Sequence, residues 1–113
     1  MEISFADKNL EKLVNDDKKL VREYGKDQAA KIKVRLAQLR AATTLEDVRN
    51  LPGRYHELLN NRKGQWGCDL IQPYRLVFVP QENPTPVTEH GQYIWLEIKG
   101  VEIVEVINYH KEK

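Results

Sequence analysis

The stretch LPGRYHELLNNRKGQW, residues 51–66, marks the point where the apolar residues change their spacing. Before it, apolar residues recur every three or four positions, as they do on one face of a helix. Leu51-Pro52-Gly53 interrupts that pattern, because proline and glycine are poorly tolerated inside helices. After it, apolar and polar residues alternate, which is typical of strands with one buried face. The change predicts helices first and a sheet second.

Residues 1–50 predict one short strand followed by three helices. The opening Glu2–Phe5 alternates polar and apolar residues, as a half-buried strand does. Asp7 stands where an N-cap would, ahead of apolar residues at helical spacing, and Asp16 with Asp17 opens a second helix. Gly25 is placed to end that helix, because glycine adopts the left-handed conformation of helix C-termini at little cost.

The third predicted helix begins after a cap at Asp27 and carries a clear apolar stripe. The stripe consists of Ala29, Ile32, Leu36 and Leu39. Four basic residues lie largely off it, namely Lys31, Lys33, Arg35 and Arg40. Such a run of charges is usually a solvated face, and RNA or an acidic protein segment is the alternative partner. Thr43 and Glu46 are spaced as a capping box, which predicts one further turn over Leu45–Arg49.

Residues 54–113 predict an antiparallel meander. Alternating or β-branched residues mark four strands, namely Tyr55–Leu59, Gln65–Ile71, Tyr74–Val79 and Val101–Tyr109. Residues 80–91 predict an exposed loop, and residues 93–98 predict a short edge segment. The predicted fold class is α+β, with N-terminal helices packed on a small antiparallel β-sheet in a single domain over residues 1–113.

The composition suits one folded domain. The chain has 113 residues, of which 41% are hydrophobic and 31% charged, and its formal net charge is +1. This balance provides no global field toward nucleic acid, so any basic character must be local. The single cysteine, Cys68, has no partner for an internal disulfide or a CxxC zinc motif. We expect it to be a small buried residue of a strand.

The N-terminus is charged from Glu2 onward and lacks the apolar stretch of a signal peptide. No apolar run approaches the roughly 18 residues that a membrane-spanning helix needs. We therefore expect a cytoplasmic protein that contacts no membrane.

Strand alternation indicates which polar side chains share a face. Residues two apart on a strand point the same way, which places His56 with Leu58. By the same rule, His110 lies with Asn108, on the face opposite Tyr109. Two of the three histidines therefore lie at strand ends.

Taken one at a time, these residues have ordinary structural explanations. A histidine near a strand end is more often a surface residue than a catalyst. Arg62 and Lys63 suit a polar turn before Gly64. Trp66, which alternates with Cys68, suits the core better than a base-stacking platform.

Taken together, the same residue types fit the cleavage of RNA by its own 2′-hydroxyl group. That reaction needs a base for the hydroxyl, positive donors for the phosphorane-like transition state, and an acid for the departing 5′-oxygen. Imidazole serves as base or acid near neutral pH, and arginine binds phosphate oxygens with a fork that stays charged. The reaction needs no metal, and the sequence holds no Asp, Glu and His cluster at ligand spacing.

The order of these motifs resembles the RelE/ParE superfamily of bacterial toxins, most closely its HigB, or plasmid-maintenance killer, branch. The pieces that carry the resemblance are LPGRYHEL (51–58), NRKGQW (61–66), PYRLVF (73–78) and VEVINYH (104–110). The resemblance covers nearly the whole chain. It implies the toxin of a type II toxin–antitoxin system, a ribosome-dependent mRNA endonuclease that inhibits translation. Its partners would be the ribosome, mRNA and a HigA-like helix-turn-helix antitoxin, through which alone it would reach operator DNA.

Carried over by position, the resemblance also implies a set of site residues. The catalytic residues would be His56, Arg75, Tyr109 and His110. The RNA-binding residues would be Arg62, Lys63 and Asn108, and no metal ion or cofactor is implied. The chain departs from the family pattern at Leu59, where a lysine is frequent, and at Asn60-Asn61, which replaces Gly-Asp. Asn108 also replaces an aspartate.

The sequence allows two other functions. A toxin of the ParE branch would act without catalysis, by binding a protein target such as DNA gyrase. An inactivated member would only bind a partner or regulate transcription. Histidines at two strand ends favour RNA chemistry, because a gyrase-binding toxin has no need of imidazoles there.

Overall fold

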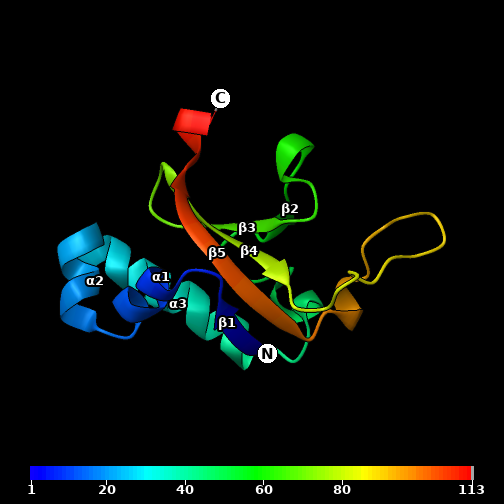
Figure 1. Ribbon diagram of the computed structural model, residues 1–113, viewed down its shortest axis with the longest axis horizontal. Coiled ribbons are helices and arrows are strands. Elements are labelled where there is room, and N and C mark those ends of the chain that lie inside the picture. The colour runs from blue at the N-terminus through cyan, green and yellow to red at the C-terminus, as the bar shows by residue number, and fades with distance from the viewer. Residues whose placement is uncertain (113) are drawn as a thin grey trace.

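The computed structural model describes residues 1–112, in which three helices cover one side of a five-stranded sheet (Figure 1). The helices are α1 (Lys8–Val14), α2 (Asp17–Tyr24) and α3 (Lys26–Ala41). The radius of gyration is 13.8 Å. This is close to the value of about 13 Å for a compact domain of this length. No helix of the described residues is long and apolar enough to cross a membrane.

The helix boundaries follow the predicted caps, with one exception. The Asp7 carboxylate accepts from the Asn9 amide at 2.7 Å, so this residue caps α1. Asp16 caps α2, and Gly25, at φ 83°, ends it. The prediction that Asp27 caps α3 is wrong, because the helix restarts immediately after Gly25. Asp27 lies in the first turn instead, where its negative charge interacts favourably with the helix dipole.

The sheet has the strand order β1-β5-β4-β3-β2 among the described residues. Its strands are β1 (Glu2–Phe5), β2 (His56–Glu57), β3 (Trp66–Asp69), β4 (Tyr74–Pro80) and β5 (Gly100–Asn108). β2 to β5 pair antiparallel, but β1 pairs parallel with β5. A parallel pair needs a long crossover, and the helices and the meander together provide it. The α+β prediction is confirmed, with a mixed sheet in place of a wholly antiparallel one.

Short 3₁₀ turns join several of these elements. They are η1 (Leu45–Val48), η2 (Asn60–Arg62), η3 (Trp95–Glu97) and η4 (Tyr109–Glu112). The turn predicted at Leu45 is confirmed, but the capping carboxylate belongs to Asp47 and not to Glu46. It accepts from the amides of Thr43 and Thr44 at 2.8 and 3.1 Å, which lowers the pKa of Asp47 below its ordinary value.

Two predicted strands are shorter or absent. The predicted strand Tyr55–Leu59 is reduced to His56–Glu57. Arg54 and Asn60, at φ 48° and 57°, turn the chain just before and after it. The predicted edge segment 93–98 is not part of the sheet, since it holds an isolated bridge at Tyr93 and the turn η3.

The main core lies between the helices and one face of the sheet. The predicted stripe of α3 is buried there, and Trp66 and Phe78 are both fully buried. Burying a large apolar side chain of this kind contributes about 1.5–3 kcal/mol relative to leaving it exposed. The interpretation of Trp66 and Cys68 as core residues is therefore confirmed.

The opposite face of the sheet carries a separate, smaller apolar cluster. Its buried members are Leu58, Val77 and Ile107, and Val104 and Tyr109 pack against them. None of these residues belongs to α1, α2 or α3. This face, which we call the open face, also carries His56 and Arg75, each two residues from a member of the cluster.

Candidate active site on the open face of the sheet

A cleft of about 350 Å³ lies on the open face and is lined by residues of η2 and η4. Figure 1 shows that these two turns project from the same end of the sheet. Four of the predicted site residues line it, namely His56, Arg62, Arg75 and Tyr109. They come from three separate parts of the chain, namely the segment of β2 and η2, β4, and η4. The remaining lining is the hairpin segment 57–61. The sheet therefore brings together the imidazole, both arginines and the phenol.

Strand register and the absence of a side chain at Gly67 explain why His56 and Arg75 line the same cleft. His56 in β2 pairs with Gly67 in β3, and Gly67 pairs with Val77 in β4. Arg75 comes two residues before Val77 and therefore points to the same face of the sheet. A β-carbon at Gly67 would lie 3.2 Å from both the Arg75 and the Leu58 side chains. Glycine at this position therefore leaves room for the Arg75 side chain to lie over β3.

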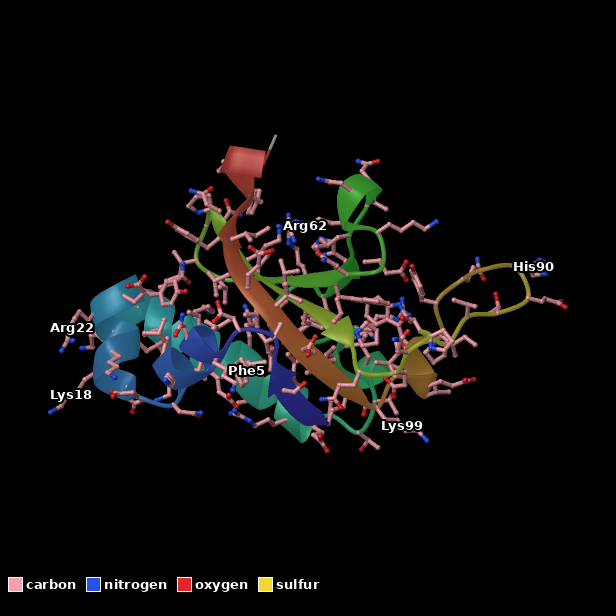
Figure 2. The ribbon with its side chains drawn as sticks, viewed as in Figure 1. Phe5, Lys18, Arg22, Arg62, His90 and Lys99 are labelled. Atoms are coloured by element: carbon pink, nitrogen blue, oxygen red, sulfur yellow. The ribbon has the colours of Figure 1, made fainter. Side chains whose placement is uncertain are left out.

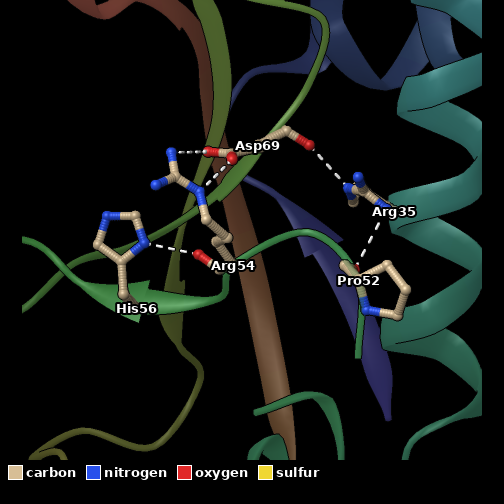
Figure 3. Close-up of polar contacts among 5 residues, drawn as sticks. All are labelled: Arg35, Pro52, Arg54, His56 and Asp69. Atoms are coloured by element: carbon tan, nitrogen blue, oxygen red, sulfur yellow. Dashed lines mark hydrogen bonds and ion pairs between the residues drawn. The ribbon is translucent and has the colours of Figure 1, made fainter. Parts of the chain in front are cut away.

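The orientation of the His56 ring is fixed by a backbone contact. Its Nδ1 lies 2.6 Å from the carbonyl oxygen of Arg54 (Figure 3). A carbonyl oxygen only accepts, so Nδ1 carries the proton of the neutral ring. Nε2 is then left with the lone pair. His56 is thus prepared to act as a base through Nε2.

Asp69 holds the segment that carries His56. Its carboxylate accepts from Arg54 Nε at 2.5 Å and Nη2 at 3.3 Å, which raises the pKa of the Arg54 guanidinium. Its amide donates to the Gly53 carbonyl at 2.7 Å. Arg54 needs this support, because its φ of 48° costs about 1–2 kcal/mol in a residue other than glycine.

Arg35 ties the same segment to α3, and the prediction of a solvated Arg35 is wrong. Its side chain is buried, and its Nε donates to the carbonyl of Asp69 at 2.7 Å (Figure 3). Nη1 donates to the carbonyl of Pro52 at 3.3 Å. The guanidinium lies against the chain reversal at Gly53 and satisfies one carbonyl of that turn, at Pro52, and one of β3, at Asp69. Lys33, on the same helix, pairs with Asp17 at the surface.

Arg75 carries a positive charge into the cleft. Its guanidinium carbon lies 4.5 Å from the centre of the Tyr109 ring, which is a cation–π distance. Its Nε is buried without a hydrogen-bond partner, and no ion pair involves this guanidinium within residues 1–112. A half-buried guanidinium without a carboxylate favours an anion in the cleft.

Arg62 is held at the side of the cleft by two acceptors. It donates to Gln65 Oε1 at 2.8 Å and to Glu105 Oε2 at 3.2 Å. Only 17% of its side chain is exposed, so its position is well defined. Its charge is shared with Glu105, which makes Arg75 the stronger attraction for an anion.

Three predicted site residues do not line this cleft. Lys63 points into another cleft, on the far side of the hairpin. Asn108 Oδ1 accepts from the His110 amide at 3.1 Å, and the exposed His110 ring lies 4.8 Å from that of Tyr109. β5 ends at Asn108 and η4 begins at Tyr109, so strand alternation does not reach His110. His110 therefore does not line the cleft with His56.

The residues that support the site were not predicted from the sequence, namely Arg35, Arg54, Gly67 and Asp69. One signal was present, because Asp69 is an acidic residue between Cys68 and Leu70 in an otherwise apolar strand. A carboxylate in such a place needs a cation. Within the described residues, no group of three or more His, Cys, Asp and Glu side chains could hold a metal ion.

Comparison with models of protein families and with curated proteins finds no match to this chain. Its function is therefore inferred from the residues of the cleft, together with the motifs that resemble the toxins named above.

Proposed function

We propose that the protein is a toxin of the HigB-like type that cleaves mRNA on the ribosome. One observation carries the proposal, namely that His56, Arg75 and Tyr109 line the same cleft. Together they provide a base, a cation for phosphate and a phenolic acid. The resemblance of the motifs to RelE/ParE toxins supports the same reading.

The proposed reaction is an internal transesterification. His56 Nε2 removes the proton of the 2′-hydroxyl group, and the 2′-oxygen attacks the adjacent phosphorus. The bond from phosphorus to the 5′-oxygen breaks, and Tyr109 gives its phenolic proton to that oxygen. The products are a 2′,3′-cyclic phosphate and a 5′-hydroxyl end, and proton exchange with water restores both side chains.

Arg75 and Arg62 stabilise the extra negative charge of the transition state. Arg75 does so without competition from a carboxylate among the described residues, whereas Arg62 is already paired with Glu105. Stacking on Tyr109 fixes the Arg75 guanidinium before the substrate arrives. Charged groups whose positions are fixed in advance need little reorganisation on the way to the transition state. This preorganisation is the main source of electrostatic catalysis.

The proposal implies a cytoplasmic setting and three partners. The ribosome would present the mRNA, and a HigA-like helix-turn-helix antitoxin would hold the toxin inactive. Operator DNA would be reached only through that antitoxin. A formal net charge of +1 fits an enzyme that depends on the ribosome for its substrate, since its own field would attract free RNA weakly.

Single-turnover cleavage of ribosome-bound mRNA tests the proposal. Arg75→Ala should lower the rate about 10²-fold or more, which corresponds to losing one transition-state donor of about 3 kcal/mol. Lys18→Ala is the matched control, because Lys18 is an exposed cation on α2, far from the cleft (Figure 2). Both variants should unfold at the same denaturant concentration as the wild type.

Wild-type cleavage by a folded Arg75→Ala variant would contradict the assignment of this cleft. A wild-type protein that leaves ribosome-bound mRNA intact but blocks the supercoiling reaction of DNA gyrase would favour the ParE-like alternative.

A further inference from the structure

A second cleft, of about 460 Å³, lies on the other side of the β2–η2 hairpin from the proposed active site. Its lining residues are Arg49, Glu57, Lys63, Gly91, Gln92 and Tyr93. The last three belong to the segment after β4, to which neither the sequence nor the proposed reaction gives a role. Figure 2 shows the tip of this segment, at His90, projecting away from the sheet. We call this second cleft the flank cleft.

The floor of the flank cleft is a set of side chains that hold one another in place. Arg49 lies over the Trp95 ring, with its guanidinium carbon 3.8 Å from the ring centre. The Trp95 indole N–H donates to Glu57 Oε2 at 2.8 Å. Arg49 also pairs with Glu46 at 2.6 Å. A cation and a carboxylate are thus positioned by the same buried indole.

The walls of the flank cleft provide an aromatic ring and a second cation. Tyr93 is half-buried against Trp66, with ring centres 5.0 Å apart. Lys63 is exposed and forms no ion pair within the described part of the chain. The cleft therefore combines a π-surface, a cation for phosphate, and groups that both donate and accept hydrogen bonds.

This combination fits a nucleotide better than a simple anion. A phosphate alone would gain nothing from Glu57, and an acidic peptide would be repelled by it. A nucleobase, in contrast, stacks on tyrosine or on a guanidinium face, and its amino group donates to a carboxylate. Glu57 keeps Oε1 for such a contact, because Oε2 accepts from Trp95.

The two clefts also lie on one path. Glu57 lines both of them, and the adjacent residues Arg62 and Lys63 line one each. A single RNA strand that crosses the hairpin would therefore contact both. We propose that the flank cleft binds a nucleotide next to the scissile phosphate and prefers a base with an amino group over uracil. This inference rests on the proposed function, because it treats the occupant as part of the same RNA.

Nuclear magnetic resonance tests the proposal without ribosomes or cleavage. The ¹⁵N-labelled full chain is titrated with cytidine 5′-monophosphate, uridine 5′-monophosphate and inorganic phosphate, and the Trp95 indole N–H peak is followed. The chain has two tryptophans, so this region of the spectrum is simple. The cytidine nucleotide should shift the peak saturably and bind about fivefold more tightly than the uridine nucleotide, the scale of one hydrogen bond to a base.

Three variants sharpen the titration. Lys63→Ala should weaken nucleotide binding about two- to fivefold, as expected for one exposed ion pair. Lys18→Ala should bind as the wild type does, because it removes a cation that lies at the opposite end of the molecule from His90 (Figure 2). Glu57→Gln should remove the preference for cytidine over uridine, because an amide both donates and accepts.

Several results would overturn the inference. They are the absence of any saturable shift, an equal affinity for inorganic phosphate, and tighter binding of a short polyglutamate peptide. The last would indicate an acidic protein segment as the occupant. Failure of nucleotide binding leaves the Arg75→Ala cleavage assay unaffected, and failure of cleavage leaves this titration unaffected, so the two proposals fail separately.

Discussion

At the scale of single residues, the site depends on side chains that fix other side chains. His56 contacts the carbonyl of Arg54, Arg54 pairs with Asp69, and Asp69 accepts from Arg35 through its carbonyl (Figure 3). This chain of contacts runs from the cleft to the buried face of α3. The tautomer of His56 is therefore set by residues that do not line the cleft.

Asp69→Ala tests this positioning role. Without its carboxylate, the Arg54 segment at φ 48° loses its main support, and Nδ1 of His56 loses a fixed acceptor. In ¹⁵N spectra at neutral or higher pH, the wild-type ring should carry its proton on Nδ1, whereas the variant should populate both tautomers. Cleavage should fall about tenfold, as is typical when a supporting partner is removed.

A wild-type ring protonated mainly on Nε2 would contradict the positioning role directly. Unchanged tautomers in Asp69→Ala would reduce Asp69 to a structural residue. For the tautomer measurement, Glu57→Gln is a matched control, because it also alters a carboxylate near the cleft but has no contact with Arg54 among those described.

The sequence predicted several residues that line the cleft, but not the residues that hold those side chains in place. His56 and Arg75 were singled out through the resemblance of their motifs to RelE/ParE toxins, and their residue types suit the chemistry that the resemblance implies. Arg35 was misjudged, because a cation within a run of charges on a helix is usually solvated. Cys68 was correctly taken as buried, and burial raises the pKa of its thiol to about 12, which leaves it unreactive.

At the scale of elements, the turn between η1 and β2 connects the helices to the site. Gly53 has φ 123°, and a β-carbon there would lie 2.8 Å from Arg35 Nε. The turn therefore needs glycine for two reasons, its backbone conformation and the guanidinium against which it packs. The same turn presents the Arg54 carbonyl to His56.

Gly53→Ala should destabilise the fold by about 2–4 kcal/mol, since it adds a clash with a buried cation to the cost of positive φ. Gly91→Ala is the matched control, because Gly91 has φ 81° but no atom within 4 Å of the added β-carbon. It should cost only about 1–2 kcal/mol. Urea unfolding measures both, and equal losses would mean that the contact with Arg35 is unimportant.

The helices and strands that were predicted correctly are those determined by interactions between residues close in the sequence. The three helices and most strands follow from caps and periodicity within a few residues. β2 is shorter than predicted because Arg54 and Asn60 adopt positive φ, which neither residue type requires. The sequence pattern of residues 93–98 is typical of a strand. In the structure, Trp95 packs in the core and its indole N–H donates to Glu57, and these contacts favour a 3₁₀ turn there.

At the scale of the whole molecule, the sheet order brings together the residues of the cleft on the open face. The pairing of β1 with β5 joins the first and last strands, and it was not visible in any local pattern. The meander from β2 to β5 then places η2 and η4 at one end of the sheet, around His56 and Arg75. The convergence of side chains from distant segments is a long-range property, so only the structure reveals that Tyr109 lines the cleft and His110 does not.

The pH dependence of single-turnover mRNA cleavage on the ribosome tests the central claim most directly. His56→Ala should cost roughly 10²–10⁴-fold, the usual size of a lost acid–base contribution, and should remove the acidic limb of the profile. Tyr109→Phe should cost a similar factor, because it removes the proposed acid. His110→Ala should keep the wild-type profile, since its ring does not line the cleft.

If His56 is the base, only the His56 variant should lose the acidic limb of this profile. Cleavage by His56→Ala at the wild-type rate, with the wild-type pH profile, would contradict this assignment.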